Sequence, residues 1–118
     1  MKMLAALLVL ASAAAAATAN FSGVWTGAFR GGDSDIPQLF ILKQQGTKLT
    51  GTGGSDSTEQ YPVLDGSITG DVVKFEVNNG QRTFIYSLKA GEKELRGSLT
   101  IKSSNDTRTT TVWLKRNH

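Results

Sequence analysis

Residues 72–89, VVKFEVNNGQRTFIYSLK, decide the fold of this chain. Apolar and polar side chains alternate on both sides of Asn79-Gly80, which is the pattern of two half-buried strands. Asn-Gly is a strong hairpin signal, because both residues tolerate the positive φ angles of a type I′ turn. The stretch therefore predicts an antiparallel hairpin with one apolar face. The side chains expected on that face are Val73, Phe75, Val77, Phe84, Tyr86 and Leu88.

The same alternation recurs outward from this hairpin along the rest of the chain, separated by turn residues. It predicts an all-β domain, a single antiparallel up-and-down meander of about eight strands that closes into a small barrel. An open sheet and a two-sheet sandwich stay open as alternatives. Gly51, Gly66 and Gly97 recur in a Leu-x-Gly-Ser/Thr pattern and predict bends or bulges that let the sheet close. The expected strands are 23–30, 38–44, 48–52, 60–68, 72–78, 82–89, 94–102 and 108–116.

Residues 1–19 have the features of a cleavable export signal. Lys2 supplies a positive charge, an apolar stretch follows it, and Ala17-Thr18-Ala19 matches a cleavage pattern. The apolar run falls short of the roughly 20 residues that a membrane anchor needs. We therefore expect an exported protein, periplasmic or extracellular, whose barrel domain occupies residues 20–118 with no transmembrane span after cleavage.

Composition excludes several kinds of chemistry. The chain has no cysteine, so disulfides and thiol catalysis are excluded and an apolar core must stabilise the domain. Removal of Lys2 leaves 12 basic and 10 acidic residues, without a basic cluster, so nucleic acid is not an expected partner. His118 is the only histidine, and Asp33-Ser34-Asp35 lacks the spacing of an EF-hand calcium loop. Asp56 and Glu59 in a neighbouring connection leave a shared cation site open as an alternative. We expect no metal and no cofactor.

A meander places alternate connections at opposite ends of the barrel. Connections 31–37, 53–59, 79–81 and 103–107 share one end, and three of them are predicted to be long. We call this end the mouth. The opposite end, which we call the base, is predicted to have tight turns and both ends of the domain.

The mouth is the expected entrance for a ligand. By strand parity, five apolar side chains line the upper interior, and two arginines point inward at the rim. This combination suits an elongated apolar ligand with an anionic head, since arginine binds carboxylates in a bidentate manner. Alternatively, the aromatic rings fill the core and the arginines extend into water. The candidate ligand-binding residues are Phe29, Phe40, Val77, Arg82, Phe84, Ile101 and Arg108.

Gly23-Val24-Trp25 in the first strand resembles the G-x-W motif of lipocalins and related calycin barrels. The resemblance implies that Trp25 packs at the closed end beneath a basic residue of the last strand, here Arg116, and that the barrel binds small molecules. The chain lacks the length, disulfides and terminal helix typical of lipocalins. Its brevity and its segment 49–52 are also similar to avidin-like barrels, although none of their biotin-site residues can be placed on it.

Three functions are compatible with this sequence. The first is a non-enzymatic binding module for a small apolar or amphipathic ligand. The second is a protein-interaction or inhibitor barrel with a filled core, acting through its mouth loops or through an exposed face at Leu39 and Ile41. The third, and least favoured, is an isomerase-like enzyme in which Tyr86 serves as the acid.

Overall fold

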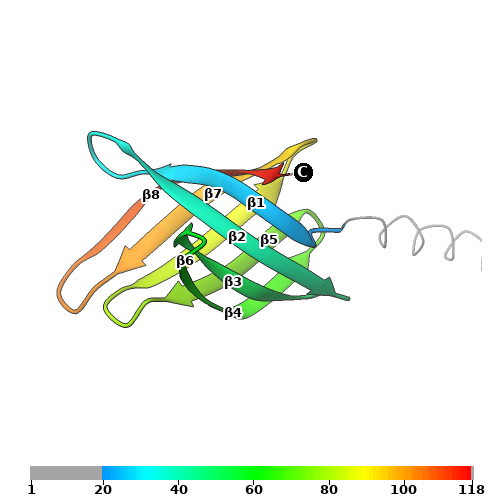
Figure 1. Ribbon diagram of the computed structural model, residues 1–118, viewed down its shortest axis with the longest axis horizontal. Helices are drawn as coiled ribbons and strands as arrows, with labels where there is room; N and C mark the ends of the chain where they lie inside the picture. Colours follow the sequence, from blue (N-terminus) through cyan, green and yellow to red (C-terminus); the bar gives the residue numbers. More distant parts are fainter. Residues whose placement is uncertain (1–19, 118) are drawn as a thin grey trace, which may run out of the picture.

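The computed structural model describes residues 20–117 as a closed barrel of eight antiparallel strands in sequence order (Figure 1). Every strand pairs with its neighbours along the chain, and β1 also pairs with β8, which completes the ring. The predicted meander and its closure are thereby confirmed. The strands are β1 Gly23–Arg30, β2 Asp35–Gln45, β3 Lys48–Asp56, β4 Glu59–Thr69, β5 Val72–Asn78, β6 Thr83–Ala90, β7 Glu94–Lys102 and β8 Thr107–Asn117.

The predicted export signal, residues 1–19, lies outside the described residues, as does His118. Within 20–117, no helix has the length and apolar character needed to span a membrane.

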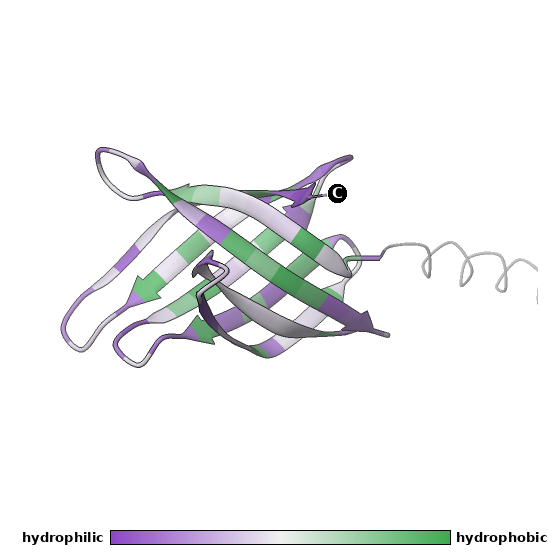
Figure 2. Ribbon diagram, viewed as in Figure 1, coloured by the Kyte–Doolittle hydropathy of each residue, from purple (hydrophilic) through white to green (hydrophobic). Residues whose placement is uncertain are grey.

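The inward faces follow the alternation of apolar residues, which appears in Figure 2 as green and purple bands crossing successive strands. On β2, where both faces are apolar, Phe40 and Leu42 point inward and are buried. Ile41 on the opposite face is 47% exposed, as the choice of inward residues predicted. The core is one continuous cluster that runs from Phe21 at the base to Phe29 and Ile101 toward the mouth.

Three of the four connections at the mouth are shorter than predicted, and the fourth, 79–82, is one residue longer. The prediction of a long connection over 53–59 is wrong, because β3 and β4 continue as paired strands as far as Asp56 and Glu59. The Asp56 carboxylate accepts hydrogen bonds from the backbone N–H groups of Thr58 (2.9 Å) and Glu59 (3.0 Å), which stabilises a two-residue turn. The other mouth connections are four residues each, 31–34, 79–82 and 103–106.

The Asn79-Gly80 turn also differs from its prediction. Of these two residues only Gly80 has a positive φ, 94°, so the turn is not type I′. Asn78 pairs with Thr83, and the four residues between them form the loop. The Asn79 side chain accepts hydrogen bonds from the N–H groups of Gln81 (3.0 Å) and Arg82 (2.9 Å), which places Arg82 in the loop rather than in the strand.

The three recurring glycines lie where the backbone of a neighbouring strand approaches closely. A Cβ atom added at Gly51, Gly66 or Gly97 would lie 2.0 Å from a backbone oxygen of the adjacent strand. Register shifts accompany the first two, between Leu49 and Thr52 and between Leu64 and Ser67. Pairing around Gly97 is regular, so this glycine permits a close bend without a bulge.

The base is closed by the segment that precedes β1. Phe21 is buried there, and the Trp25 indole N–H donates to its carbonyl oxygen (2.9 Å). The Arg116 guanidinium lies 4.5 Å above the centre of the Trp25 ring, a cation–π contact. It also donates to the carbonyl oxygens of Asn20 (2.7 Å) and Ser22 (2.5 Å). The predicted pairing of Trp25 with Arg116 at the base is confirmed, and the two ends of the domain meet there (Figure 1).

Candidate functional site

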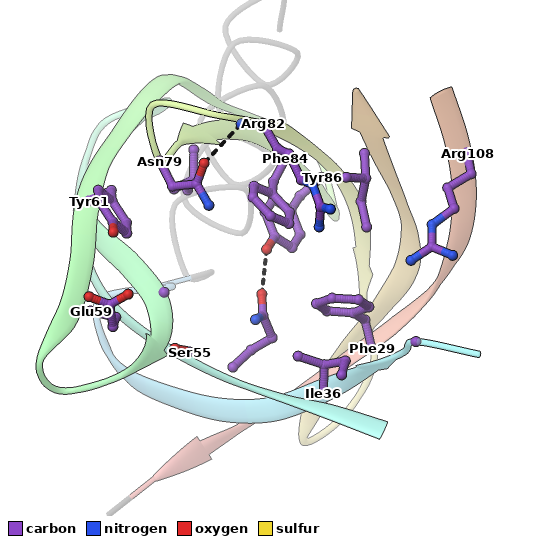
Figure 3. A pocket seen from close by; sticks show the side chains of 15 residues that line it. Phe29, Ile36, Ser55, Glu59, Tyr61, Asn79, Arg82, Phe84, Tyr86 and Arg108 are labelled. Atoms are coloured by element: carbon purple, nitrogen blue, oxygen red, sulfur yellow. Dashed lines mark hydrogen bonds between the residues drawn. The ribbon is translucent and has the colours of Figure 1, made fainter. Parts of the chain in front are cut away.

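A pocket of about 260 Å³ opens at the mouth of the barrel (Figure 3). It is assembled from the mouth ends of several strands, so residues distant in sequence converge on it. Its apolar wall includes Phe29, Ile36, Val77, Phe84 and Ile101, and its polar residues include Gln38, Glu59, Arg82, Tyr86 and Arg108. An eight-stranded barrel has room for side chains or for one small ligand, and this volume matches the second case.

Three aromatic rings limit the depth of the pocket. Phe40 packs edge-on against Phe75 (5.3 Å between ring centres) and Tyr86 (5.1 Å), and Phe75 stacks on Tyr86 (4.8 Å). This cluster fills the middle of the barrel. The pocket is therefore confined to the mouth half of the interior, and a compact ligand fits it better than the elongated one expected from the sequence.

Six of the seven candidate ligand-binding residues line this pocket. Phe29, Val77 and Ile101 are buried and Phe84 is half-buried, whereas both arginines are exposed at the rim. Phe40 does not line the pocket, because it is fully buried in the aromatic cluster below it. The lining candidates are Phe29, Val77, Arg82, Phe84, Ile101 and Arg108.

The two rim arginines are held on neighbouring parts of the barrel wall. Arg108 pairs in register with Ile101 across β7 and β8, and Arg82 ends the loop before β6. They share a small hollow with Ser103 and Asp106. Neither arginine forms an ion pair within residues 20–117, where the two ion pairs present, Arg30–Asp35 and Arg96–Glu94, lie outside the pocket. Both guanidinium groups are thus available to bind an anion, with Asp106 as the acidic neighbour in their shared hollow.

A carboxylate balances part of this positive charge. Glu59 lines the pocket from the start of β4. Figure 3 places it on the side of the pocket opposite Arg108. An anionic group entering the mouth is therefore favoured on the side of β6 and β8 and repelled on the side of β4.

A buried polar pair forms the inner end of the pocket. The Tyr86 hydroxyl donates a hydrogen bond to the Gln38 side-chain oxygen, shown by a dashed line in Figure 3. The Gln38 amide nitrogen donates in turn to the Pro37 carbonyl oxygen (2.9 Å). Sequence reasoning missed Gln38. The signal was available, because the alternation that turns Phe40 inward also turns Gln38 inward.

Burial raises the pKa of the Tyr86 hydroxyl well above its ordinary value, so the group stays protonated at neutral pH. A general acid works best with a pKa near the operating pH, and this shift runs in the opposite direction. The raised pKa therefore gives no support to the hypothesis that Tyr86 serves as an acid.

In the part of the chain that the structure describes, no cluster of three or more acidic or histidine side chains has the geometry to hold a metal ion. Asp56, considered above with Glu59 as an acidic pair, uses its carboxylate in its own turn. Hydrogen bonds from Thr58 and Glu59 also lower the pKa of that carboxyl.

Comparison with known proteins adds no relative from which a function could be transferred. No protein-family model matches the chain, and no curated protein or solved structure matches it significantly. The function is therefore argued from the geometry of the site.

Proposed function

We propose that this chain is an exported, non-enzymatic binding protein whose mouth pocket holds a compact apolar molecule with an anionic head. One observation carries the proposal. Arg82 and Arg108, which form no ion pair among residues 20–117, lie at the rim of an apolar pocket of about 260 Å³. Apolar walls with a few convergent polar groups are the usual composition of a small-molecule site. The apolar body would contact Phe29 and Phe84, and the head group would bind Arg82 and Arg108.

The size of the pocket sets the class of ligand. Most drug-sized ligands occupy pockets of roughly 300–1,000 Å³, so this one suits a molecule at or below the lower end of that range. The aromatic cluster around Phe40 leaves no depth for a long acyl chain. Small aromatic or short branched carboxylic acids meet both conditions.

Native mass spectrometry of the protein purified under mild conditions from its own source tests the proposal. We expect a retained small acid, which the double variant Arg82→Ala/Arg108→Ala loses because charge-assisted hydrogen bonds to the head are removed. In titration calorimetry the double variant should bind that acid at least about tenfold more weakly. Arg30→Ala is the matched control, since Arg30 also lies at the mouth but outside the pocket.

Two results would contradict the proposed function. One is the absence of any retained molecule together with no binding from a panel of small carboxylic acids. The other is equal loss of affinity in the double variant and in Arg30→Ala, because this would indicate a general effect of charge.

We further propose that the barrel is calycin-like and that residues 1–19 direct its export. The Trp25–Arg116 contact at the base supports the first part, because lipocalin-like barrels carry that arrangement at their closed end. The hydrogen bond from Arg116 to Asn20 supports the second, because it makes the residue that follows the predicted cleavage point part of the folded domain. N-terminal sequencing of the exported protein should give Asn20 as the first residue.

A protein-interaction function is the second candidate, favoured by one observation on the outer wall. Ile41 is 47% exposed and pairs in register with Val24, so an apolar strip crosses β1 and β2 on the outside of the barrel. Ile41→Lys would abolish capture of a protein partner and leave the binding of small acids unchanged. The mouth pocket supports the small-ligand function more directly, because a filled interior was expected for the interaction barrel.

A further inference from the structure

The inner end of the pocket carries a feature that an apolar ligand alone does not require. Gln38 is the one buried polar or charged residue among those the structure describes, and Tyr86 beside it is only 2% exposed. Burial of polar groups costs free energy unless they are hydrogen-bonded, and the other large buried side chains of the described residues are aliphatic or aromatic. The Gln38–Tyr86 pair lines the pocket, so a ligand that fills it contacts both side chains.

The hydrogen bonds of this pair have a fixed direction. The Pro37 carbonyl oxygen only accepts, so the Gln38 group facing it must be the amide nitrogen, at 2.9 Å. The Gln38 oxygen then faces Tyr86 and accepts the hydroxyl hydrogen. The hydroxyl hydrogen of Tyr86 is used in this bond, but the Tyr86 oxygen can still accept a hydrogen bond through a lone pair. The Gln38 amide has a second N–H that can still donate one.

One ligand group satisfies both of these positions. A hydroxyl donates through its hydrogen and accepts through its oxygen, whereas a carbonyl only accepts and a methyl group does neither. A ligand that displaces water from the pocket without replacing these hydrogen bonds leaves the second position on each group without a partner, which weakens binding.

We propose, building on the function proposed above, that the pocket recognises a hydroxy-substituted aromatic carboxylic acid. The carboxylate lies at the rim beside Arg82 and Arg108, and the hydroxyl lies at the inner end against Tyr86 and Gln38. The ring lies between them, in contact with the Phe29 and Phe84 rings that line the wall, in the packing that aromatic groups prefer. Glu59, across the pocket from Arg108, disfavours a position of the carboxylate on the β4 side of the mouth.

The test compares two acids of nearly equal size by titration calorimetry, 4-hydroxycinnamate and 4-methylcinnamate, on the unaltered domain, residues 20–118. We expect the hydroxy acid to bind at least about tenfold more tightly, because only it satisfies the buried pair. The preference should fall to about twofold or less in Tyr86→Phe. Tyr61→Phe is the matched control, since Tyr61 also lines the pocket but takes no part in the pair, and it should keep the full preference.

Different results overturn different claims. Equal affinity for the two acids on the unaltered domain refutes the hydroxyl contact and leaves the proposed binding function in place. A preference that persists in a folded Tyr86→Phe variant refutes the assignment to this pair. Failure of both acids to bind refutes this inference, and if no small carboxylate of a wider panel binds either, the proposed function fails with it. Circular dichroism of each variant establishes that it is folded, and the comparison on the unaltered domain decides the main point without any variant.

Discussion

At the scale of single residues, Arg116 makes several stabilising contacts at the base. Its guanidinium covers the Trp25 ring at 4.5 Å and donates to two carbonyl oxygens of the segment before β1. The planar guanidinium makes both kinds of interaction at once, because its face covers the ring while its N–H groups donate at the edge, and the lysine ammonium has no such plane.

Arg116→Ala should lower the free energy of unfolding by about 2 kcal/mol, because a cation–π contact and two hydrogen bonds are lost together. Arg116→Lys should recover less than half of that loss. Urea unfolding followed by Trp fluorescence measures both values. Ligand affinity at the mouth should be unchanged, and a loss of affinity without a loss of stability would show that the two ends were assigned wrongly.

Tyr86 makes the stability of the barrel sensitive to alkaline pH. Burial raises the pKa of its hydroxyl in the folded state above the ordinary value of about 10, so folding favours the protonated form. The stabilisation is fully present below about pH 10 and is lost as the pH rises toward the folded-state pKa, because the unfolded chain releases this proton first.

We therefore expect the free energy of unfolding of the unaltered domain to fall between about pH 10 and pH 12. Tyr86→Phe should show a shallower decline over the same range, although it is less stable at pH 7 because Gln38 loses its hydrogen-bond donor. Urea titrations at several pH values test this. Parallel declines in the two proteins would argue against Tyr86 as the source.

At the scale of the strands, closure of the barrel depends on glycines rather than on bulges alone. Gly97 in β7 faces the Ser87 carbonyl oxygen of β6, where a Cβ atom would come within 2.0 Å. The obstructing atom belongs to backbone, which cannot move aside as a flexible side chain can.

Gly97→Ala should destabilise the domain by about 3 kcal/mol or more, because β6 and β7 must separate to admit the methyl group. Gly91→Ala, in the adjoining turn, is the matched control, since its added Cβ would meet nothing closer than 3.5 Å. Thermal unfolding by differential scanning calorimetry compares the two. A cost for Gly97→Ala no larger than that for Gly91→Ala would contradict this account.

The strands were predictable because alternation is a local property. Strands β1, β5 and β7 have the boundaries predicted from the sequence, and Phe40 and Leu42 face inward as predicted. The β3–β4 hairpin was not predictable in length. Its Gly-rich stretch from Gly51 to Gly54 has little apolar pattern, and strand pairing there depends on a partner strand and on the Asp56 side chain.

The candidate site was predictable in part for the same reason. Parity placed Phe29, Phe84 and Arg108 at the mouth correctly, because parity needs only a strand and its direction. It could not show that Phe40 belongs to an aromatic cluster below the pocket, since that depends on how rings from three strands meet. The pairing of Gln38 with Tyr86 depends on contacts between residues 48 positions apart.

At the scale of the whole molecule, a barrel without disulfides is stabilised by its core and by the closure of its base. Phe21 is 5% exposed, and its backbone N–H donates to the Gln44 side chain (2.7 Å). The Gln44 N–H donates to the Ser22 hydroxyl oxygen (2.9 Å). The three residues before β1 are therefore part of the folded domain.

A domain that begins at Gly23 should unfold at a temperature about 10 °C or more below one that begins at Asn20. The shorter domain loses the burial of Phe21 and the hydrogen bonds of its neighbours, about 2–4 kcal/mol together. Differential scanning calorimetry of the two domains measures the difference. Unfolding temperatures within about 2 °C of each other would show that the segment contributes little.

The closed base has a consequence for the movement of a bound molecule. With Phe21 and Trp25 sealing one end, a guest that enters by the mouth has to reverse along the same path to leave. Under the proposed function, the barrel would hold its ligand at the mouth and would not conduct it from one end to the other. Release of such a ligand would then depend on access to the mouth alone, so a molecule that covers the rim would slow both its binding and its release.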